Sequence, residues 1–241
     1  MLNIAHRGFS GNYPENTMLA FRKAVEAGAD GIENDVHLTK DGELVIIHDE
    51  RIDRTCDGEG YVCDYTLEEL KQFDASAGFR GKYGVNRIPT LREYFEFVKP
   101  INGFITNIEL KTGYNVYPGI EKKVADMIHE FGLEDRIIIS SFNHFSVARF
   151  KALCPEVRCG FLEGDWILDF GVYAREHGVE CVHPCCNTVT EETAKEIREN
   201  GIQINTWTVN TPDEVRRLYK LGVNAVISNY PDMAKEVIES M

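Results

Sequence analysis

The sequence lacks any pattern that indicates disulfide bonds or a structural zinc site. It has seven cysteines, an odd number, and none of them forms a Cys-x-x-Cys pair. Cys185 and Cys186 are adjacent and unsuited to bridging each other, and together with Cys181 and His183 they do not have the spacing of zinc ligands. We therefore expect buried, free thiols in a reduced, cytoplasmic protein.

Long apolar segments and a surplus of positive charge are also missing. The first residues, MLNIAHRG, contain no basic stretch followed by an apolar one, so we expect no secretory signal, and no apolar run approaches the length of a membrane span. With 26 basic and 39 acidic residues, the net charge is −13. This charge argues against broad binding to nucleic acid or to anionic membranes, and an anionic substrate would need local positive groups.

What the sequence does contain is a regular alternation of strand and helix patterns. Near the start of the chain, strands are expected at residues 3–5 and within 31–50, and a helix from about 17 to 27. The later strands are expected over residues 104–111, 136–141, 157–162, 179–183, 202–209 and 225–227. The later helices are expected over residues 91–98, 118–131, 144–153, 167–177, 191–200, 211–221 and 232–238. Eight such units in 241 residues predict one α/β domain over residues 1–241, a (β/α)₈ TIM barrel.

Residues 51–88 interrupt this alternation. They contain turn-forming residues, one short helix expected over residues 67–73, and a stretch rich in glycine and polar residues. Irregular segments of this length in compact domains are often functional. We interpret 51–88 as a small insertion after the second strand, beside the site.

The richest stretch for chemistry is residues 31–50, GIENDVHLTKDGELVIIHDE. Alternation along a strand places Glu33 and Asp35 on one face, where two carboxylates repel each other unless a cation lies between them. The turn at residues 40–42 then returns His48 to the same region. A plain surface hairpin with solvated charges is the alternative interpretation. His37 lies near the strand end, and we expect a supporting or surface role for it rather than metal binding.

In a TIM barrel the active site lies at the carboxyl ends of the strands, and reactive residues gather at those positions. The carboxylates Glu33, Asp35 and Glu109 are hard ligands that favour Ca²⁺, Mg²⁺ or Mn²⁺ over Zn²⁺. Arg7 and Lys111 suit a phosphate group, and His6 and His48 suit general acid and base catalysis. Phe142 and Trp207 follow two other strands and are expected to line the substrate pocket. Together these nine residues predict a metal-dependent phosphoryl centre.

The ordered motifs of the chain resemble those of the glycerophosphodiester phosphodiesterase family. The matching segments run over nearly the whole chain and comprise HisArgGly at 6–8, ProGluAsnThr at 14–17, Glu-x-Asp-Val at 33–36, LeuThrLysAspGly at 38–42, HisAsp at 48–49, AspArgThr at 53–55, IleGluLeuLys at 108–111, SerPhe at 141–142 and TrpThrValAsn at 207–210. Strand eight departs from the family, because SerAsnTyrPro at 228–231 stands where Thr-Asp-x-Pro is common. This departure leaves a role for Asn229 open.

The resemblance implies hydrolysis of glycerophosphodiesters, small molecules, to glycerol 3-phosphate and an alcohol. It implies that His6 and His48 are the acid/base pair and that Glu33, Asp35 and Glu109 bind a divalent metal, usually Ca²⁺ or Mg²⁺. It also implies attack by the glycerol 2-hydroxyl through a cyclic phosphate, with the assignment of acid and base left open. The segment 51–88 matches the family's small subdomain.

Three other functions are compatible with parts of the pattern. The barrel could act on intact phospholipid, which the acidic charge disfavours, or use Lys111 as a Schiff-base lysine in a lyase or aldolase. It could also be a binding module without catalysis, which the complete set of metal and histidine positions disfavours.

Overall fold

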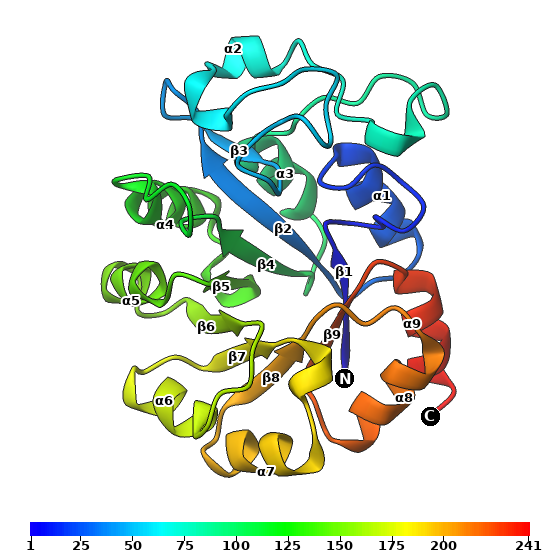
Figure 1. The fold of residues 1–241 in the computed structure, drawn as a ribbon, viewed down its shortest axis with the longest axis vertical. Helices are drawn as coiled ribbons and strands as arrows, with labels where there is room; N and C mark the ends of the chain where they lie inside the picture. The colour runs from blue at the N-terminus through cyan, green and yellow to red at the C-terminus, as the bar shows by residue number, and fades with distance from the viewer.

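A computed structural model describes all residues, 1–241, and shows a closed barrel of eight parallel strands (Figure 1). The barrel strands are β1 (Leu2–His6), β2 (Gly31–Leu38), β4 (Ile105–Leu110), β5 (Ile137–Ser141), β6 (Arg158–Glu163), β7 (Cys181–Pro184), β8 (Gln203–Thr206) and β9 (Ala225–Ser228). Neighbouring strands pair in this order, and the pairs β1–β9 and β1–β2 close the ring. The predicted (β/α)₈ fold is confirmed.

Helices lie outside the strands and cover the barrel all round (Figure 1). They are α1 (Met18–Glu26), α3 (Leu91–Val98), α4 (Ile120–Phe131), α5 (His144–Leu153), α6 (Phe170–Glu176), α7 (Glu191–Glu199), α8 (Pro212–Lys220) and α9 (Pro231–Glu239). Most ends lie within two residues of those predicted. The helix expected from residue 167 begins only at Phe170, and Ile167 and Leu168 lie in the preceding loop, where Leu168 is almost fully exposed.

Side-chain caps define where several helices begin. Thr90, Thr190 and Thr211 each accept a hydrogen bond from the third helical amide, while the side chain at that position bonds back to the threonine amide. This reciprocal capping satisfies two backbone donors that the first helical turn leaves without partners. The starts of α3, α7 and α8 are therefore encoded locally.

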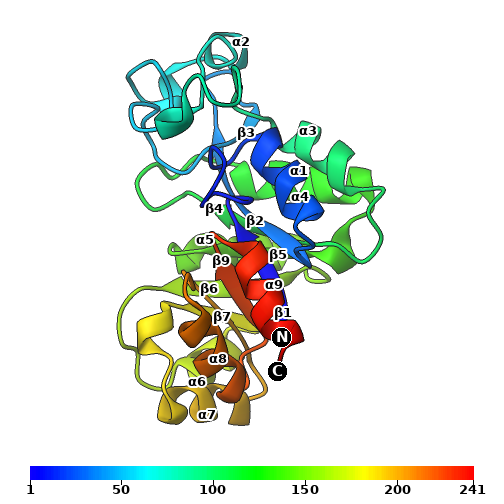
Figure 2. The same cartoon turned by 90° about the vertical axis from the view of Figure 1, so that its right-hand side faces the viewer.

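The second βα unit carries the extra chain. Strand β3 (Leu44–Ile46) pairs antiparallel with β2 outside the ring, and residues 51–88 follow with α2 (Leu67–Leu70) and the 3₁₀ helices η1 (Val62–Asp64) and η2 (Ala77–Phe79). The predicted helix at 67–73 is thus a single turn. This segment protrudes from one end of the molecule (Figure 2). The segment and the residues that flank it share a small core of their own. This core comprises Val45, Ile47, Ile52, Cys56, Val62, Leu70, Ala75 and Ile88.

The main core fills the space between the strands and the helices. Of the aromatic residues expected there, Phe21, Phe95 and Phe131 are buried, while Phe97 is only partly buried against the core. Short 3₁₀ helices η3 (Glu134–Arg136) and η4 (Cys186–Thr188) complete the connections. No helix has both the length and the apolar character needed to cross a membrane.

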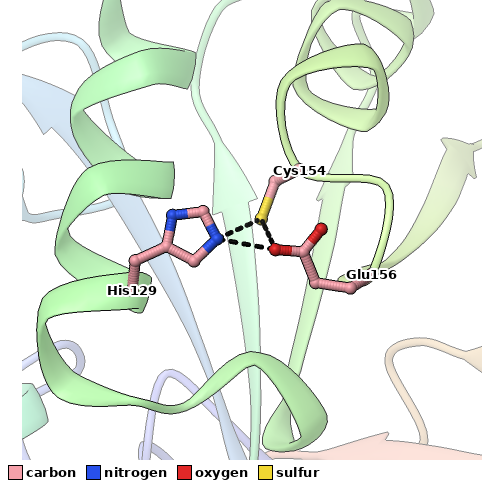
Figure 3. Close-up of side chains that lie close together, drawn as sticks. All are labelled: His129, Cys154 and Glu156. Atoms are coloured by element: carbon pink, nitrogen blue, oxygen red, sulfur yellow. Dashed lines mark hydrogen bonds and ion pairs between the residues drawn. The ribbon is translucent and has the colours of Figure 1, made fainter.

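All seven cysteines are free thiols, and most are buried, as predicted. Cys154 follows α5 and lies beside His129, from α4, and Glu156 (Figure 3). The two chain termini lie near each other in both views (Figures 1 and 2).

Candidate active site

Three carboxylates meet inside the barrel mouth. Glu33 and Asp35 project from the same face of β2, and Glu109 of β4 is the register partner of Asp35. Each offers an oxygen, all of these oxygens lie within 4.8 Å of one another, and all three residues are buried. The alternation predicted for residues 33 and 35 therefore brings the two groups together with a third from the neighbouring strand.

Burial makes it unfavourable for all three carboxylates to carry a negative charge. Burial first, and then the charges of Asp35 and Glu109, raise the pKa of Glu33 well above its ordinary value. Burial is also the main cause that raises the pKa of Glu109, and the positive charge of Lys111 acts against this rise. At Asp35 burial is outweighed, and Lys111, His48 and Arg7 together hold its pKa below its usual range. The cluster thus needs positive charge to stay ionised.

Two cations border the carboxylates. The Lys111 Nζ lies 2.9 Å from Glu109 Oε1 and 3.7 Å from Asp35 Oδ1. The Arg7 guanidinium lies 2.9 Å from Glu15 Oε1 through Nη1 and 3.5 Å from Asp35 Oδ2 through Nε. Burial works against the charge on both, but the neighbouring carboxylates raise the pKa of each above its ordinary value.

His6 ends β1 and is held through one ring nitrogen. Its Nδ1 lies 2.6 Å from Asn229 Oδ1, and because an amide oxygen only accepts, Nδ1 carries the proton. Its Nε2 is then free to accept and lies 3.9 Å from Glu33 Oε2. Burial, and then the charge of Arg7, lowers the pKa of His6 to about 4, so the ring is neutral at pH 7.

The chain turns sharply directly after His6. Arg7 and Gly8 both have positive φ, of 55° and 76°, and the Arg7 amide donates to Glu33 Oε2 at 3.0 Å. A side chain at Gly8 would place its Cβ 2.7 Å from the backbone carbon of Ala20. Glycine is thus required by both backbone conformation and close packing. The HisArgGly motif therefore turns the chain so that its amide bonds the acidic cluster.

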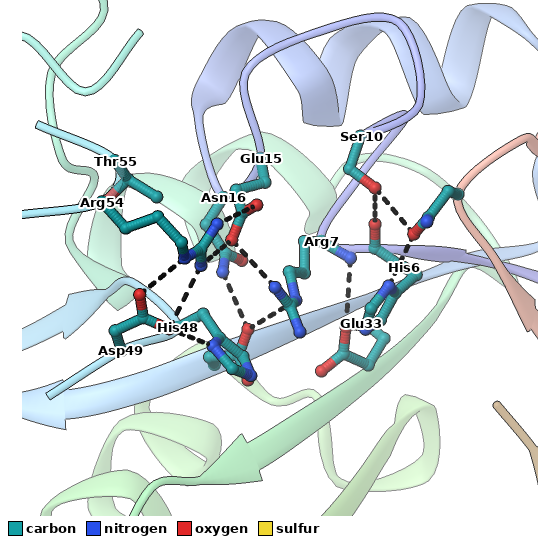
Figure 4. A network of polar contacts seen from close by, with 12 residues as sticks. His6, Arg7, Ser10, Glu15, Asn16, Glu33, His48, Asp49, Arg54 and Thr55 are labelled. Atoms are coloured by element: carbon teal, nitrogen blue, oxygen red, sulfur yellow. Dashed lines mark hydrogen bonds and ion pairs between the residues drawn. The ribbon is translucent and has the colours of Figure 1, made fainter. Parts of the chain in front are cut away.

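His48 follows β3 and is also held through Nδ1, here by a carboxylate. Nδ1 donates to Asp49 Oδ1 at 2.6 Å, and Lys111 Nζ lies 3.3 Å from Nε2. Arg54, from segment 51–88, bonds both Asp49 and Glu15 (Figure 4). His37 is buried, and its Nε2 lies 3.1 Å from the His48 carbonyl oxygen. It therefore supports the backbone of His48, which is the first of the two roles predicted for it, a supporting or a surface role.

His6, His48 and two of the carboxylates line one cleft. Seven of the nine residues singled out from the sequence line it, namely His6, Arg7, Glu33, His48, Glu109, Phe142 and Trp207. Phe142 and Trp207 form an edge-to-face pair, with ring centroids 5.6 Å apart, on the apolar side of the cleft. Asp35 lies beneath the surface, and Lys111 borders an adjoining hollow that shares Glu109 and Phe142 with the cleft.

The three carboxylates fit a divalent cation. Asp35 Oδ1 is buried and has no hydrogen-bond partner, and the three closely spaced oxygens are the donor type preferred by Ca²⁺ and Mg²⁺. Three carboxylates beside Arg7 and Lys111 leave the inner site negative, and a divalent cation reverses that sign. Glu33, Asp35 and Glu109 could therefore hold such a metal and make the cleft attractive to a phosphodiester anion.

Sequence reasoning missed several residues that support this site. Asn229 had an open role but bonds His6, and Asn16 Nδ2 donates to Asp35 Oδ2 at 2.8 Å. Arg54 and Glu15 form a bidentate ion pair that connects the segment 51–88 to the first loop. Glu15 and Asn16 belong to the motif ProGluAsnThr, and Arg54 belongs to the motif AspArgThr. These motifs were the sequence signal that could have indicated a role for the three residues in the site.

The chain is similar to known proteins over nearly its whole length. The model of the glycerophosphoryl diester phosphodiesterase family matches residues 6–233. A glycerophosphodiester phosphodiesterase of Caldanaerobacter subterraneus subsp. tengcongensis is 45% identical to the chain, and the match covers 96% of this chain and 95% of the relative. One of Bacillus altitudinis is 44% identical, and the match covers 99% of this chain and 98% of the relative.

Solved structures show the same fold. A phosphodiesterase of Oleispira antarctica, in complex with the product sn-glycerol-3-phosphate, superposes with a TM-score of 0.87 at 31% identity, covering 98% of this chain and 96% of that one. A glycerophosphodiester phosphodiesterase of Thermotoga maritima gives a TM-score of 0.76 at 30% identity, covering 100% and 99%. The chain therefore belongs to the glycerophosphoryl diester phosphodiesterase family, and it is an enzyme of that family.

Proposed function

We propose that the enzyme hydrolyses small glycerophosphodiesters to glycerol 3-phosphate and an alcohol, with a divalent cation held by Glu33, Asp35 and Glu109. The observation that carries this proposal is the cluster of three buried carboxylates beside a cleft that His6 and His48 line. The names of the relatives and the product in the Oleispira structure support the substrate class. When bound, the cation neutralises charge on the phosphoryl oxygens. Residues 1–241 act as one catalytic domain, and the free thiols support a cytoplasmic location.

His6 is assigned as the base and His48 as the acid. His6 Nε2 takes the proton from the glycerol 2-hydroxyl, whose oxygen attacks phosphorus, and His48 Nε2 gives a proton to the departing alcohol. A neutral amide holds His6 and burial keeps it unprotonated at pH 7, whereas His48 is held by the Asp49 carboxylate and its Nε2 lies 3.3 Å from the Lys111 ammonium. Water then opens the cyclic phosphate, with the two proton transfers reversed.

Arg7 and Lys111 are proposed to contact the phosphoryl oxygens. Both lie beside the carboxylate cluster and are partly accessible, with side-chain exposures of 18% and 12%. Phe142 and Trp207 are proposed to hold the apolar faces of the substrate.

Chelation tests the role of the metal. Excess EDTA should abolish release of glycerol 3-phosphate, and Ca²⁺, Mg²⁺ or Mn²⁺ should restore it, because the substrate would otherwise face an acidic cleft. The Glu33→Gln and Glu109→Gln variants should need higher metal concentrations for half-maximal activity. Full turnover by the chelated enzyme would contradict the proposal.

A substrate analogue without the 2-hydroxyl tests the route. If the 2-hydroxyl is the nucleophile, the 2-deoxy analogue should bind as a competitive inhibitor without being cleaved. Cleavage of the analogue at a rate near that of the natural diester would show that water attacks directly.

A further inference from the structure

A second group of metal-ligating side chains lies on the outside of the barrel, apart from the cleft. His129 is in the last turn of α4, Cys154 caps the end of α5, and Glu156 lies in the turn before β6 (Figure 3). In a βα barrel the helices run opposite to the strands, so the ends of α4 and α5 lie at the face away from the active site. The catalytic chemistry therefore gives no reason for this grouping.

The contacts converge on a single point. Cys154 Sγ lies 3.4 Å from His129 Nε2 and 3.4 Å from Glu156 Oε1, and the same two atoms of His129 and Glu156 lie 2.6 Å apart. A nucleophilic cysteine triad would place the carboxylate on the other ring nitrogen, Nδ1, to orient the base. Here the thiol and the carboxylate both meet Nε2, which is the arrangement of a ligand set.

The separations suit a tetrahedral metal ion. With zinc–nitrogen and zinc–sulfur bonds of about 2.0–2.3 Å, ligand atoms around a tetrahedral ion lie roughly 3.3–3.6 Å apart. Both sulfur separations already fall in this range. The third, between His129 and Glu156, would need to open, and their side-chain exposures of 45% and 49% leave space for this movement.

The turn that carries two of the ligands is braced. Lys151 Nζ donates to the carbonyl oxygens of Pro155 and Val157, at 2.9 and 3.0 Å, and to Glu180 Oε1 at 2.6 Å. Cys154 itself is fully buried, with its amide bonded to Phe150 at 2.9 Å. The sulfur is therefore held in place while the two exposed ligands can adjust around a cation.

We propose that His129, Cys154 and Glu156 form a second metal site, which takes zinc or a similar borderline divalent cation with water as a further ligand. Sulfur and imidazole donors select such ions, whereas the oxygen-only cluster in the cleft favours Ca²⁺ or Mg²⁺. The bound ion would join α4 to the α5–β6 turn and stabilise the barrel without taking part in catalysis.

Titration of the metal-stripped full-length protein with Co²⁺ tests this site. Thiolate ligation should produce a sulfur-to-cobalt charge-transfer band in the near ultraviolet, and Zn²⁺ should displace the cobalt and remove the band. Cys154→Ala should abolish the band. His129→Gln and Glu156→Gln change exposed side chains that leave the core intact, and each should weaken Zn²⁺ binding at least tenfold.

Matched controls separate this site from the other thiols and from the cleft. Cys185→Ser, His177→Gln and Glu33→Gln should keep the band and the Zn²⁺ affinity of this site. With the cleft cluster saturated by Ca²⁺, Zn²⁺ should raise the melting temperature of the unaltered protein and of these controls, but not of Cys154→Ala. The proposal is overturned if no thiolate band forms, if the band survives Cys154→Ala, or if the His129 and Glu156 variants bind Zn²⁺ like the unaltered protein.

Discussion

At the scale of single residues, His6 and His48 share one arrangement and differ in one partner. Each is anchored through Nδ1, and Nε2 lies 3.9 Å from Glu33 Oε2 in His6 and 3.3 Å from Lys111 Nζ in His48. His6 is anchored by the amide of Asn229 and His48 by the carboxylate of Asp49. Because a carboxylate stabilises an imidazolium and an amide does not, the pair is suited to opposite proton transfers.

Removal of either imidazole should remove one proton transfer. We expect His6→Ala and His48→Ala each to lower kcat by about 10²–10⁴-fold, the usual contribution of general acid–base catalysis. Circular dichroism and the melting temperature should show an intact fold. Near-normal turnover in a folded variant would exclude that histidine from the chemistry.

Asn229 should act as a positioning residue for His6. Asn229→Ala is expected to lower kcat/KM by about 10²-fold, since a loosely held base is misplaced. In Asn229→Asp the new carboxylate should raise the pKa of His6, so the acid limb of the kcat/KM profile should move to higher pH. Ser10→Ala, which removes another bond to Asn229, is the control and should leave the profile in place. An unchanged profile in Asn229→Asp would argue against His6 as the base.

At the scale of structural elements, segment 51–88 is connected to the site in two ways. Arg54 bonds Asp49, directly behind His48, and Tyr61 stacks on Tyr114 of the β4–α4 loop with ring centroids 6.0 Å apart. Tyr114 borders the hollow that adjoins the cleft through Glu109 and Phe142. The departing alcohol is therefore expected to lie in this hollow, beside the segment.

Tyr114→Ala should change substrate preference rather than chemistry. We expect KM to rise several-fold for diesters of bulky alcohols and to stay unchanged for diesters of the smallest ones. Steady-state rates on a series of alcohols would measure this difference. Tyr219→Ala, at an exposed tyrosine of α8, is the matched control. A uniform rise in KM for every alcohol would place the alcohol elsewhere.

At the scale of the whole molecule, burial inside the closed barrel makes stability depend on pH. His183 is fully buried, and burial lowers its pKa from 6.5 to about 3. Between these two pH values the unfolded chain binds a proton at this residue and the folded protein does not. Its contribution to stability is therefore complete above pH 6.5 and is lost as the pH falls toward 3.

His183→Asn should weaken this pH dependence. Relative to its own value at pH 7.5, we expect the variant to lose less stability by pH 4.5 than the unaltered protein, by about 3 kcal/mol. Urea unfolding at both pH values would measure the difference. His177→Asn, at an exposed histidine, should behave like the unaltered protein, and equal slopes in all three proteins would contradict the buried, neutral state of His183.

The sequence by itself determined the βα alternation, most helix starts and the face on which Glu33 and Asp35 lie. These features depend on local patterns, namely apolar periodicity, threonine caps and strand alternation, and each pattern involves only residues that are close in the sequence. Only the tertiary structure decided which partner each reactive group meets. Asn229 reaches His6 across 223 residues because the barrel closes, and Arg54 reaches Glu15 because segment 51–88 packs back over the first loop. The meeting of His129 with Cys154 likewise comes from the packing of two helices, which no local pattern encodes.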